Sequence, residues 1–98
     1  FRSLDDNYTI SEVKAKPEFF GKTLAVLDTI DKYRLTLITI IRKREKKNLI
    51  GKKSIVKETI GRPAPDTIVL ENDILVVYGY NKDIETYCLG QEEHQIRS

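Results

Sequence analysis

The segment Leu35–Ile41 constrains the fold most strongly, because it is a short run of Leu, Ile and Thr with polar residues on both sides. Ile and Thr are β-branched, and a short apolar run with polar ends is typical of a strand at the centre of a sheet. Thr36 and Thr39 interrupt the run, which is far shorter than the roughly 20 apolar residues that a membrane-spanning helix requires. We therefore expect a sheet with this segment at its centre and no membrane span.

Two hairpins and a connector are predicted after this strand. The basic, polar run Arg42–Lys53 leads into the strand-like segment Ser54–Ile60, and together they predict a long hairpin. A Glu-Asn-Asp turn separates the short strand Thr67–Leu70 from the apolar run Ile74–Tyr78, which predicts a second hairpin. The intervening segment Gly61–Asp66 contains two prolines, which cannot donate hydrogen bonds to a sheet, so it is expected to be an extended connector.

A helix is predicted from Lys22 to Asp31, after Pro17 and a short turn. Its four apolar residues span an arc of about 160 degrees, which is wider than packing against one sheet requires. Part of this helix is therefore expected to face a second subunit, and a short helix packed entirely within its own core is the alternative. The four residues are Leu24, Val26, Leu27 and Ile30.

The two ends of the chain complete the predicted domain. Tyr8–Val13 is expected to form an edge strand, whereas Asn81 is expected to cap a final helix that stops at Gly90. This organisation predicts an N-terminal linker at 1–7, one domain at 8–90 and a polar, frayed tail at 91–98. The fold class is α+β, with a small mixed or antiparallel sheet, a helix after the first strand and a C-terminal helix. The residues expected to face inward from the last helix are Ile84, Tyr87 and Cys88.

Composition and charge argue against nucleic acid as a partner. The 98 residues carry a net charge of only +2, whereas nucleic-acid-binding domains usually carry a clear basic excess. The densest basic cluster, Arg42–Lys53, has no aromatic residue to stack on bases. We expect no nucleic acid, although contact of this cluster with nucleic acid or with an anionic membrane surface stays an alternative.

No catalytic or metal-binding pattern is present. Gly21-Lys22-Thr23 matches the end of a phosphate-binding loop, but Lys16 stands where that motif needs its first glycine. The single histidine, His94, lies in the predicted tail, away from any nucleophile, and has no partner at metal-ligand spacing. The sequence therefore predicts neither an enzyme nor a metal site. The chain contains no Met and one Cys, so we expect a piece of a longer protein, without an internal disulfide, from a reducing compartment.

Three stretches together resemble one protein family, the C-terminal domain of RCK proteins, also called the TrkA C-terminal domain. They are Tyr8–Val13, Pro17–Asp28 with its Phe-Phe-Gly-Lys-Thr-Leu sequence, and Pro65–Gly79, and the likeness extends from Tyr8 to about Tyr87. Domains of this family belong to cytosolic gating subunits of potassium channels and transporters. The resemblance implies a homodimeric regulatory domain of a potassium or other cation transport system. It also implies a cytoplasmic location at the inner face of the membrane, through a channel or transporter subunit in the same chain or complex.

The resemblance further implies a site for a small nucleotide-type ligand between two subunits. In the potassium-uptake branch of the family this ligand is cyclic di-AMP. The positions that correspond to its binding site are Leu24, Ile30, Arg34, Thr36, Arg62, Pro63 and Pro65. The positions that correspond to the dimer interface are Phe20, Leu24, Val26, Leu27 and Ile30.

Two of these positions depart from the pattern of the cyclic di-AMP branch. Ile30 stands where arginine is usual, and Thr36 stands where asparagine is usual. Loss of an arginine–phosphate hydrogen bond removes about 1.5 to 3 kcal/mol of binding free energy. Arg34 and Arg62 are cations that could replace it from another direction. The identity of the ligand therefore stays open, and a purely structural dimerisation domain without a ligand is the alternative hypothesis.

Overall fold

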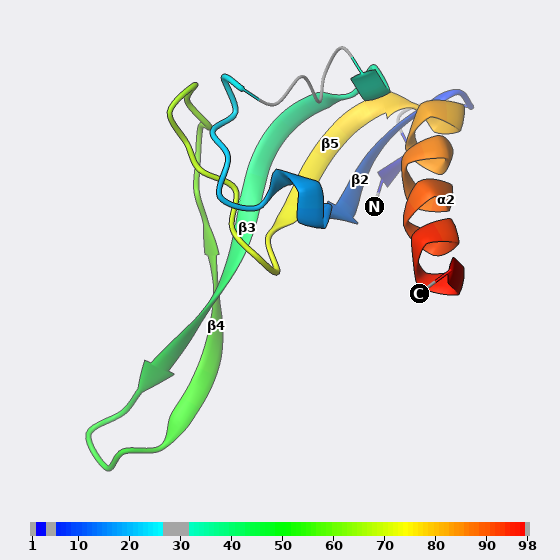
Figure 1. Cartoon of the computed structure of the whole chain (residues 1–98). Helices are drawn as coiled ribbons and strands as arrows, with labels where there is room; N and C mark the ends of the chain where they lie inside the picture. The colour runs from blue at the N-terminus through cyan, green and yellow to red at the C-terminus, as the bar shows by residue number, and fades with distance from the viewer. Residues whose placement is uncertain (1, 4–5, 27–31, 98) are drawn as a thin grey trace.

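The computed structural model describes residues 2–3, 6–26 and 32–97. They form a five-stranded sheet with a 3-10 helix and a C-terminal α-helix, which is the predicted α+β class (Figure 1). The strands lie in the order β1-β2-β5-β3-β4, and every neighbouring pair is antiparallel. The elements are β1 (Arg2–Ser3), β2 (Tyr8–Lys14), η1 (Pro17–Phe19), β3 (Thr36–Lys47), β4 (Lys53–Thr59), β5 (Ile74–Tyr80) and α2 (Asn81–Arg97).

β5 organises the sheet, because it pairs with β2 along its whole length and with β3 on its other edge. Side chains along β5 alternate between the two faces of the sheet, as the geometry of a strand requires. Leu75 is buried and is paired with Val13 of β2 and with Ile40 of β3, which are buried too. The prediction of a central strand at Leu35–Ile41 is confirmed, since β3 lies between β5 and β4.

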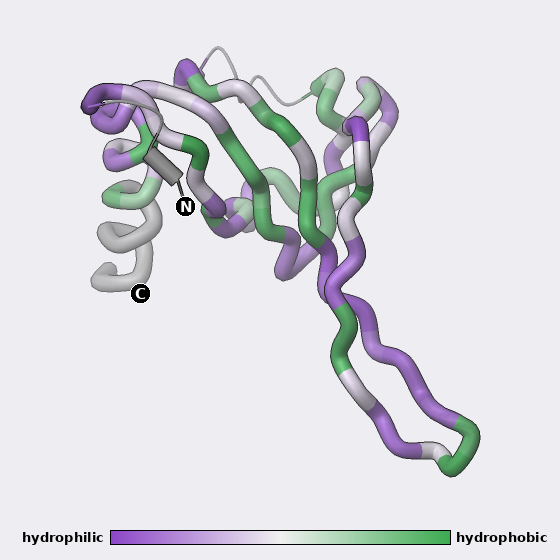
Figure 2. Tube along the Cα trace, turned by 180° about the vertical axis from the view of Figure 1, so that it is seen from behind, coloured by the Kyte–Doolittle hydropathy of each residue, from purple (hydrophilic) through white to green (hydrophobic). Residues whose placement is uncertain are grey.

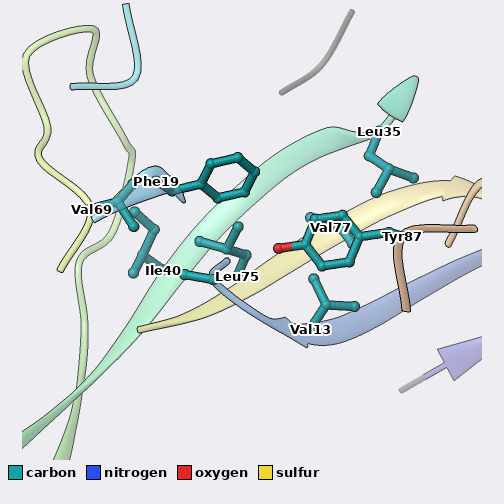
Figure 3. Close-up of a cluster of buried hydrophobic side chains, with 9 residues drawn as sticks. Val13, Phe19, Leu35, Ile40, Val69, Leu75, Val77 and Tyr87 are labelled. Atoms are coloured by element: carbon teal, nitrogen blue, oxygen red, sulfur yellow. The ribbon is translucent and has the colours of Figure 1, made fainter. Parts of the chain in front are cut away.

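The core lies on one face of the sheet, under η1 and α2. Tyr87 points from α2 toward the strands that carry Val13 and Val77 (Figure 3). Its ring is fully buried, and its Oη donates a hydrogen bond to the Lys14 carbonyl oxygen at 2.6 Å. Burial raises the pKa of the Tyr87 phenol above its ordinary value of 10.0. The other buried apolar residues are Ala15, Phe19, Leu35, Ile40, Val69 and Leu75.

The first predicted hairpin is confirmed, and it is much longer than the body of the sheet needs. β3 and β4 pair in register from Ile41 opposite Thr59 to Lys47 opposite Lys53. Both strands leave the body of the molecule together and project into solvent (Figures 1 and 2). We call the segment Arg42–Thr59 the arm.

The second predicted hairpin is wrong. β5 already has β2 and β3 as partners, so it has no free edge for the strand predicted at Thr67–Leu70. That segment instead pairs with residues 21–25, through an antiparallel bridge between Thr23 and Ile68. The turn before β5 is as predicted, because Asn72 adopts a left-handed φ of 70°.

The predicted helix Lys22–Asp31 is wrong over the residues that the structure describes. Residues 22–26 form the bridge at Thr23 and a turn, because Leu24 N and Ala25 N donate to the carbonyl oxygens of Thr67 and Pro65 rather than along a helix. Residues 27–31 lie outside the described part of the chain. The helical segment after the first long strand is η1, which Pro17 begins.

The two ends also differ from the prediction. α2 passes through Gly90 and continues to Arg97, because glycine in a helix costs only about 1 kcal/mol and does not by itself end it. The Asn81 amide nitrogen donates to the Asp6 carbonyl oxygen, and its amide oxygen accepts from the Thr9 hydroxyl, so Asn81 ties the start of α2 to the chain before β2. β2 is an edge strand only in its second half, since β1 pairs with Thr9 and Ile10.

Candidate ligand and assembly site

A short ladder joins two of the segments that carry predicted site residues. Gly21 N donates to the Val69 carbonyl oxygen at 2.7 Å, and Leu24 N donates to the Thr67 carbonyl oxygen at 3.0 Å. Ala25 N donates to the Pro65 carbonyl oxygen at 2.9 Å. The structure therefore brings Leu24 beside the proline connector, although both lie far apart in the sequence.

This ladder presents apolar side chains to solvent. Val69 is fully buried in the core, so its neighbours Ile68 and Leu70 point away from the core, as alternation along an extended chain requires. Ile68 is 47% exposed and Leu70 is 43% exposed, and Val26 at the end of the ladder is 71% exposed. We call Val26, Ile68 and Leu70 the apolar rim. Its residues come from both strands of the ladder.

The predicted dimer-interface residues divide between the core and this rim. Phe20 and Leu24 are half-buried and pack against the protein's own core, whereas Val26 is largely exposed. Leu27 and Ile30 lie outside the described residues. Ile68 and Leu70 were not predicted, although alternation around an apolar Val69 between two turn-forming segments was a signal that could have found them.

The remaining predicted ligand residues lie along β3 and the connector. Thr39 Oγ1 donates to the Gly61 carbonyl oxygen at 2.6 Å, which fixes the start of the connector against β3. Thr36 lies about 10 Å further back along the strand, given the rise of a β-strand, and is exposed. Arg34, with a left-handed φ of 59°, precedes it and is exposed as well. No hydrogen bond among the described residues joins Arg34 or Thr36 to Leu24.

The connector itself is open to solvent. Arg62 and Pro65 are exposed and Pro63 is half-buried, while the Thr67 hydroxyl accepts from Ala64 N at 2.9 Å and closes the end of the loop. Arg62 directly precedes Pro63, whose ring fixes its own φ angle, and the Arg62 side chain is exposed. This arrangement suits contact with an anionic group of a ligand.

A separate hollow of about 1020 Å³ lies beside the arm, between η1, the end of β2, the residues Lys43–Glu45 of β3 and the turn before β5. Its walls carry basic residues, among them Lys14 and Lys43, but also the carboxylates of Glu18, Glu45 and Glu71. Opposite charges therefore offset one another there. Of the predicted ligand residues that the structure describes, none lines this hollow.

An ion pair beside the hollow holds the arm to the body, and its carboxylate, Asp73, lines the hollow. Arg42 Nε and Nη2 donate to the two carboxylate oxygens of Asp73 at 2.9 and 2.8 Å, and Nη2 also donates to the Ile68 carbonyl oxygen at 2.9 Å. The Asp73 side chain is fully buried and also accepts from Leu70 N at 2.8 Å. The hydrogen bond to Asp73 raises the pKa of the Arg42 guanidinium. Arg42 therefore links β3 to the segment that carries the apolar rim.

Lys16 forms a second buried polar cluster. Its ammonium donates to Tyr33 Oη at 3.0 Å and lies 4.4 Å from the Tyr33 ring centroid and 4.5 Å from that of Tyr87. An ammonium over two aromatic faces is stabilised by their quadrupoles. These contacts fix the chain between β2 and η1 against α2, and they account for the burial of Lys16.

The described part of the chain contains neither a group of metal-binding side chains nor a membrane-spanning helix. Within residues 2–3, 6–26 and 32–97, no three His, Cys, Asp or Glu side chains group as metal ligands would. In the same residues, no helix is long and apolar enough to span a membrane.

The fold and the apolar rim define a small α+β domain with an exposed apolar edge. No protein-family model matches the chain, and no curated protein matches its sequence.

Proposed function

We propose that this chain is a dimerising regulatory domain that binds a small ligand between two copies of itself and thereby controls a potassium or other cation channel or transporter. The observation that carries the proposal is the ladder, which joins Leu24 to the proline connector and leaves the apolar rim exposed. Exposed apolar side chains that cluster on one edge are typical of a surface that associates with another chain. The proposed role is binding and not catalysis.

A second copy of this chain is the proposed occupant of the rim. The resemblance to the RCK C-terminal domain puts the subunit interface on the same segment, through Val26. Two copies related by a twofold axis would bring two connectors, and with them two Arg62 guanidinium groups, toward one shared cleft. A ligand with two phosphates, such as cyclic di-AMP, has the symmetry and charge that such a cleft suits. The proposed location, in the cytoplasm at the inner membrane face, follows from the same resemblance.

Analytical ultracentrifugation tests the assembly. We expect a dimer, and we expect V26D/I68D to shift the chain to monomer because two buried carboxylates would oppose association. The matched control is Leu89→Asp, which places the same charge on an exposed apolar residue of α2, 53% exposed and away from the rim. A monomeric parent chain, or a V26D/I68D variant that dimerises as the parent does, contradicts the proposal.

Calorimetric titration tests the ligand. We expect saturable heat with cyclic di-AMP or a related dinucleotide, at one ligand per two chains, and a weaker signal with Arg62→Gln. A dimer that gives no heat with any of these ligands supports the alternative, an assembly domain without a ligand. That alternative is motivated by Ile30 and Thr36, which replace the two polar residues of the cyclic di-AMP branch.

A further inference from the structure

Beyond Arg42, the arm contributes no residue to the buried core or to the proposed dimer interface. Beyond Arg42, its two strands pair in register for five further residue pairs, which corresponds to about 17 Å of reach at the rise of a β-strand. Figure 2 shows this part extending away from the body, with an apolar end and with sides that are mostly polar but include one apolar stretch. The apolar residues within β4 are Ile55 and Val56, and Ile55 is 74% exposed. An isolated two-stranded ribbon gains little stability in water. The stability of the fold therefore does not account for the length and composition of the arm.

The tip of the arm is a built turn. Asn48 Oδ1 accepts hydrogen bonds from Ile50 N at 3.0 Å and from Lys52 N at 2.9 Å, and Asn48 N donates to the Lys52 carbonyl oxygen at 3.0 Å. Gly51 has a φ of +81°, which side-chain-bearing residues rarely adopt. These contacts hold Leu49 and Ile50 outward at the far end of the molecule.

The tip is apolar where a water-facing turn is normally polar. Leu49 is 105% exposed and Ile50 is 86% exposed, so both side chains have no contact that would bury them within the chain. Two adjacent aliphatic side chains at the end of a projecting hairpin gain free energy only by entering an apolar environment.

The sides of the arm carry more positive charge than pairing within the arm can neutralise. Lys43 lies opposite Lys57, and Lys47 lies opposite Lys53, although like charges at directly opposed positions destabilise a strand pair. Only Lys53 of these four has an ion-pair partner in the arm, Glu45 at 3.3 Å.

The positive charge is also concentrated in the arm. From residue 43 to residue 58 there are seven cationic and two anionic residues, a net charge of +5, whereas the whole chain carries only +2. The remainder of the chain is therefore net acidic. An anionic partner attracted to this protein meets the arm and not the body.

We propose that the arm binds the anionic surface of a lipid bilayer, with Leu49 and Ile50 inserted at the boundary of the headgroups and the acyl chains. The apolar residues at the tip match the acyl-chain layer of such a surface, and the lysines that flank them match its layer of anionic headgroups. Lys46, Lys47 and Lys52 border the tip and meet the phosphates when the tip is inserted. Nucleic acid fits less well, because its phosphates give no apolar layer for the tip and the arm has no aromatic residue to stack on bases.

Co-sedimentation of the chain with vesicles tests this proposal. We expect binding to vesicles of phosphatidylcholine and phosphatidylglycerol in equal parts, weaker binding at high salt, and none to vesicles of phosphatidylcholine alone. L49S/I50S should weaken binding at least tenfold. K47Q/K52Q should weaken it roughly 25-fold, since each lysine near an anionic surface contributes about fivefold. The matched control is K22Q/K82Q, which removes the same charge from two exposed positions of the body and should leave binding within about twofold.

The outcomes separate this proposal from its competitors. Equal binding to both kinds of vesicle, or equal loss in K47Q/K52Q and K22Q/K82Q, overturns it. Binding of a DNA duplex by the parent chain that L49S/I50S leaves unchanged, without binding to vesicles, assigns the arm to nucleic acid instead. An L49S/I50S variant that turns a dimer into a monomer assigns the tip to subunit assembly, which also overturns the proposal. Circular dichroism of each variant checks that its fold is intact.

Discussion

Replacing Arg42 with Met should destabilise the protein more than replacing any other cation of the arm. The change leaves the Asp73 carboxylate fully buried, with Leu70 N as its remaining donor, and it also removes the donor to the Ile68 carbonyl oxygen. Breaking a buried ion pair from one side costs about 3 to 5 kcal/mol. The Arg42 side chain is 24% exposed, so we expect the lower end, about 3 kcal/mol.

Urea denaturation followed by circular dichroism measures this loss. A fall of about 3 kcal/mol in the free energy of unfolding also corresponds to a drop in Tm of at least about 10 °C for a domain of this size. The double variant R42M/D73N should recover part of the loss, because it removes the uncompensated charge together with its partner.

Arg44→Met is the matched control for this experiment. Arg44 pairs with Glu58 at 3.4 Å, but the two side chains are 68% and 46% exposed. Exposed ion pairs contribute about 0 to 1 kcal/mol, so this variant should unfold almost as the parent does. If Arg42→Met lost less than about 1 kcal/mol, or no more than Arg44→Met, the inference that this ion pair holds the arm to the body would be refuted.

Three further changes test the core, the sheet and the tip. In the parent chain, the free energy of unfolding should fall as pH rises above 10.0, because Tyr87 then ionises in the unfolded state while burial keeps the phenol neutral in the folded state. In urea titrations at several pH values, Tyr87→Phe should make this fall smaller. Gly79→Ala should lower Tm by several degrees, because the added Cβ would lie 2.5 Å from Leu35 Cδ2. Asn48→Ala should speed amide hydrogen exchange at Ile50 and Lys52 by about tenfold while Tm stays nearly constant, since it removes two hydrogen bonds from the tip alone.

Each of these predictions has an outcome that contradicts it. Parallel pH profiles of the parent and Tyr87→Phe would show that burial of this phenol does not drive the alkaline loss. An unchanged Tm for Gly79→Ala would mean that Leu35 has room to move. Slow exchange in the Asn48→Ala tip, or a large fall in Tm, would show that the turn is held by contacts other than the asparagine side chain.

The sequence predicted the parts of the fold that local pattern controls. The central strand at Leu35–Ile41, the long hairpin and the left-handed turn at Asn72 all depend on side-chain type over a few residues, and all three are present. The inward face of the last helix was also predicted, through Tyr87. The α+β class follows from these elements.

The parts that failed depend on long-range pairing. The apolar spacing after Lys22 fits a helix, but residues 21–25 find backbone partners at 65–69, and no local pattern reports that. The strand near Val69 was predicted correctly as extended and wrongly as a partner of β5, because the sequence does not show that β5 has two other partners. Within the apolar rim, Val26 was named from the sequence as an interface residue, whereas Ile68 and Leu70 were missed although their alternation around the buried Val69 is a local signal.

The sequence named residues for the candidate site but did not show how they are arranged. The structure brings Leu24 beside the connector at Pro65, whereas Thr36 begins β3 with Arg34 just before it, and Ile30 lies outside the described residues. Side-chain type alone identified Ile30 and Thr36 as departures from the pattern of the cyclic di-AMP branch. The distance between Leu24 and the connector depends on the ladder, which arises from the fold as a whole.

The continuity of β3 has a mechanical consequence. One strand of twelve residues begins in the sheet at Thr36 and ends near the tip of the arm at Lys47, and it contains no glycine or proline that could act as a hinge. The arm is thus continuous with the sheet and is anchored at Arg42, where the guanidinium binds the buried Asp73 carboxylate. A partner that binds the tip therefore also sets the orientation of the sheet. A movement of the bound tip would rotate the sheet with it.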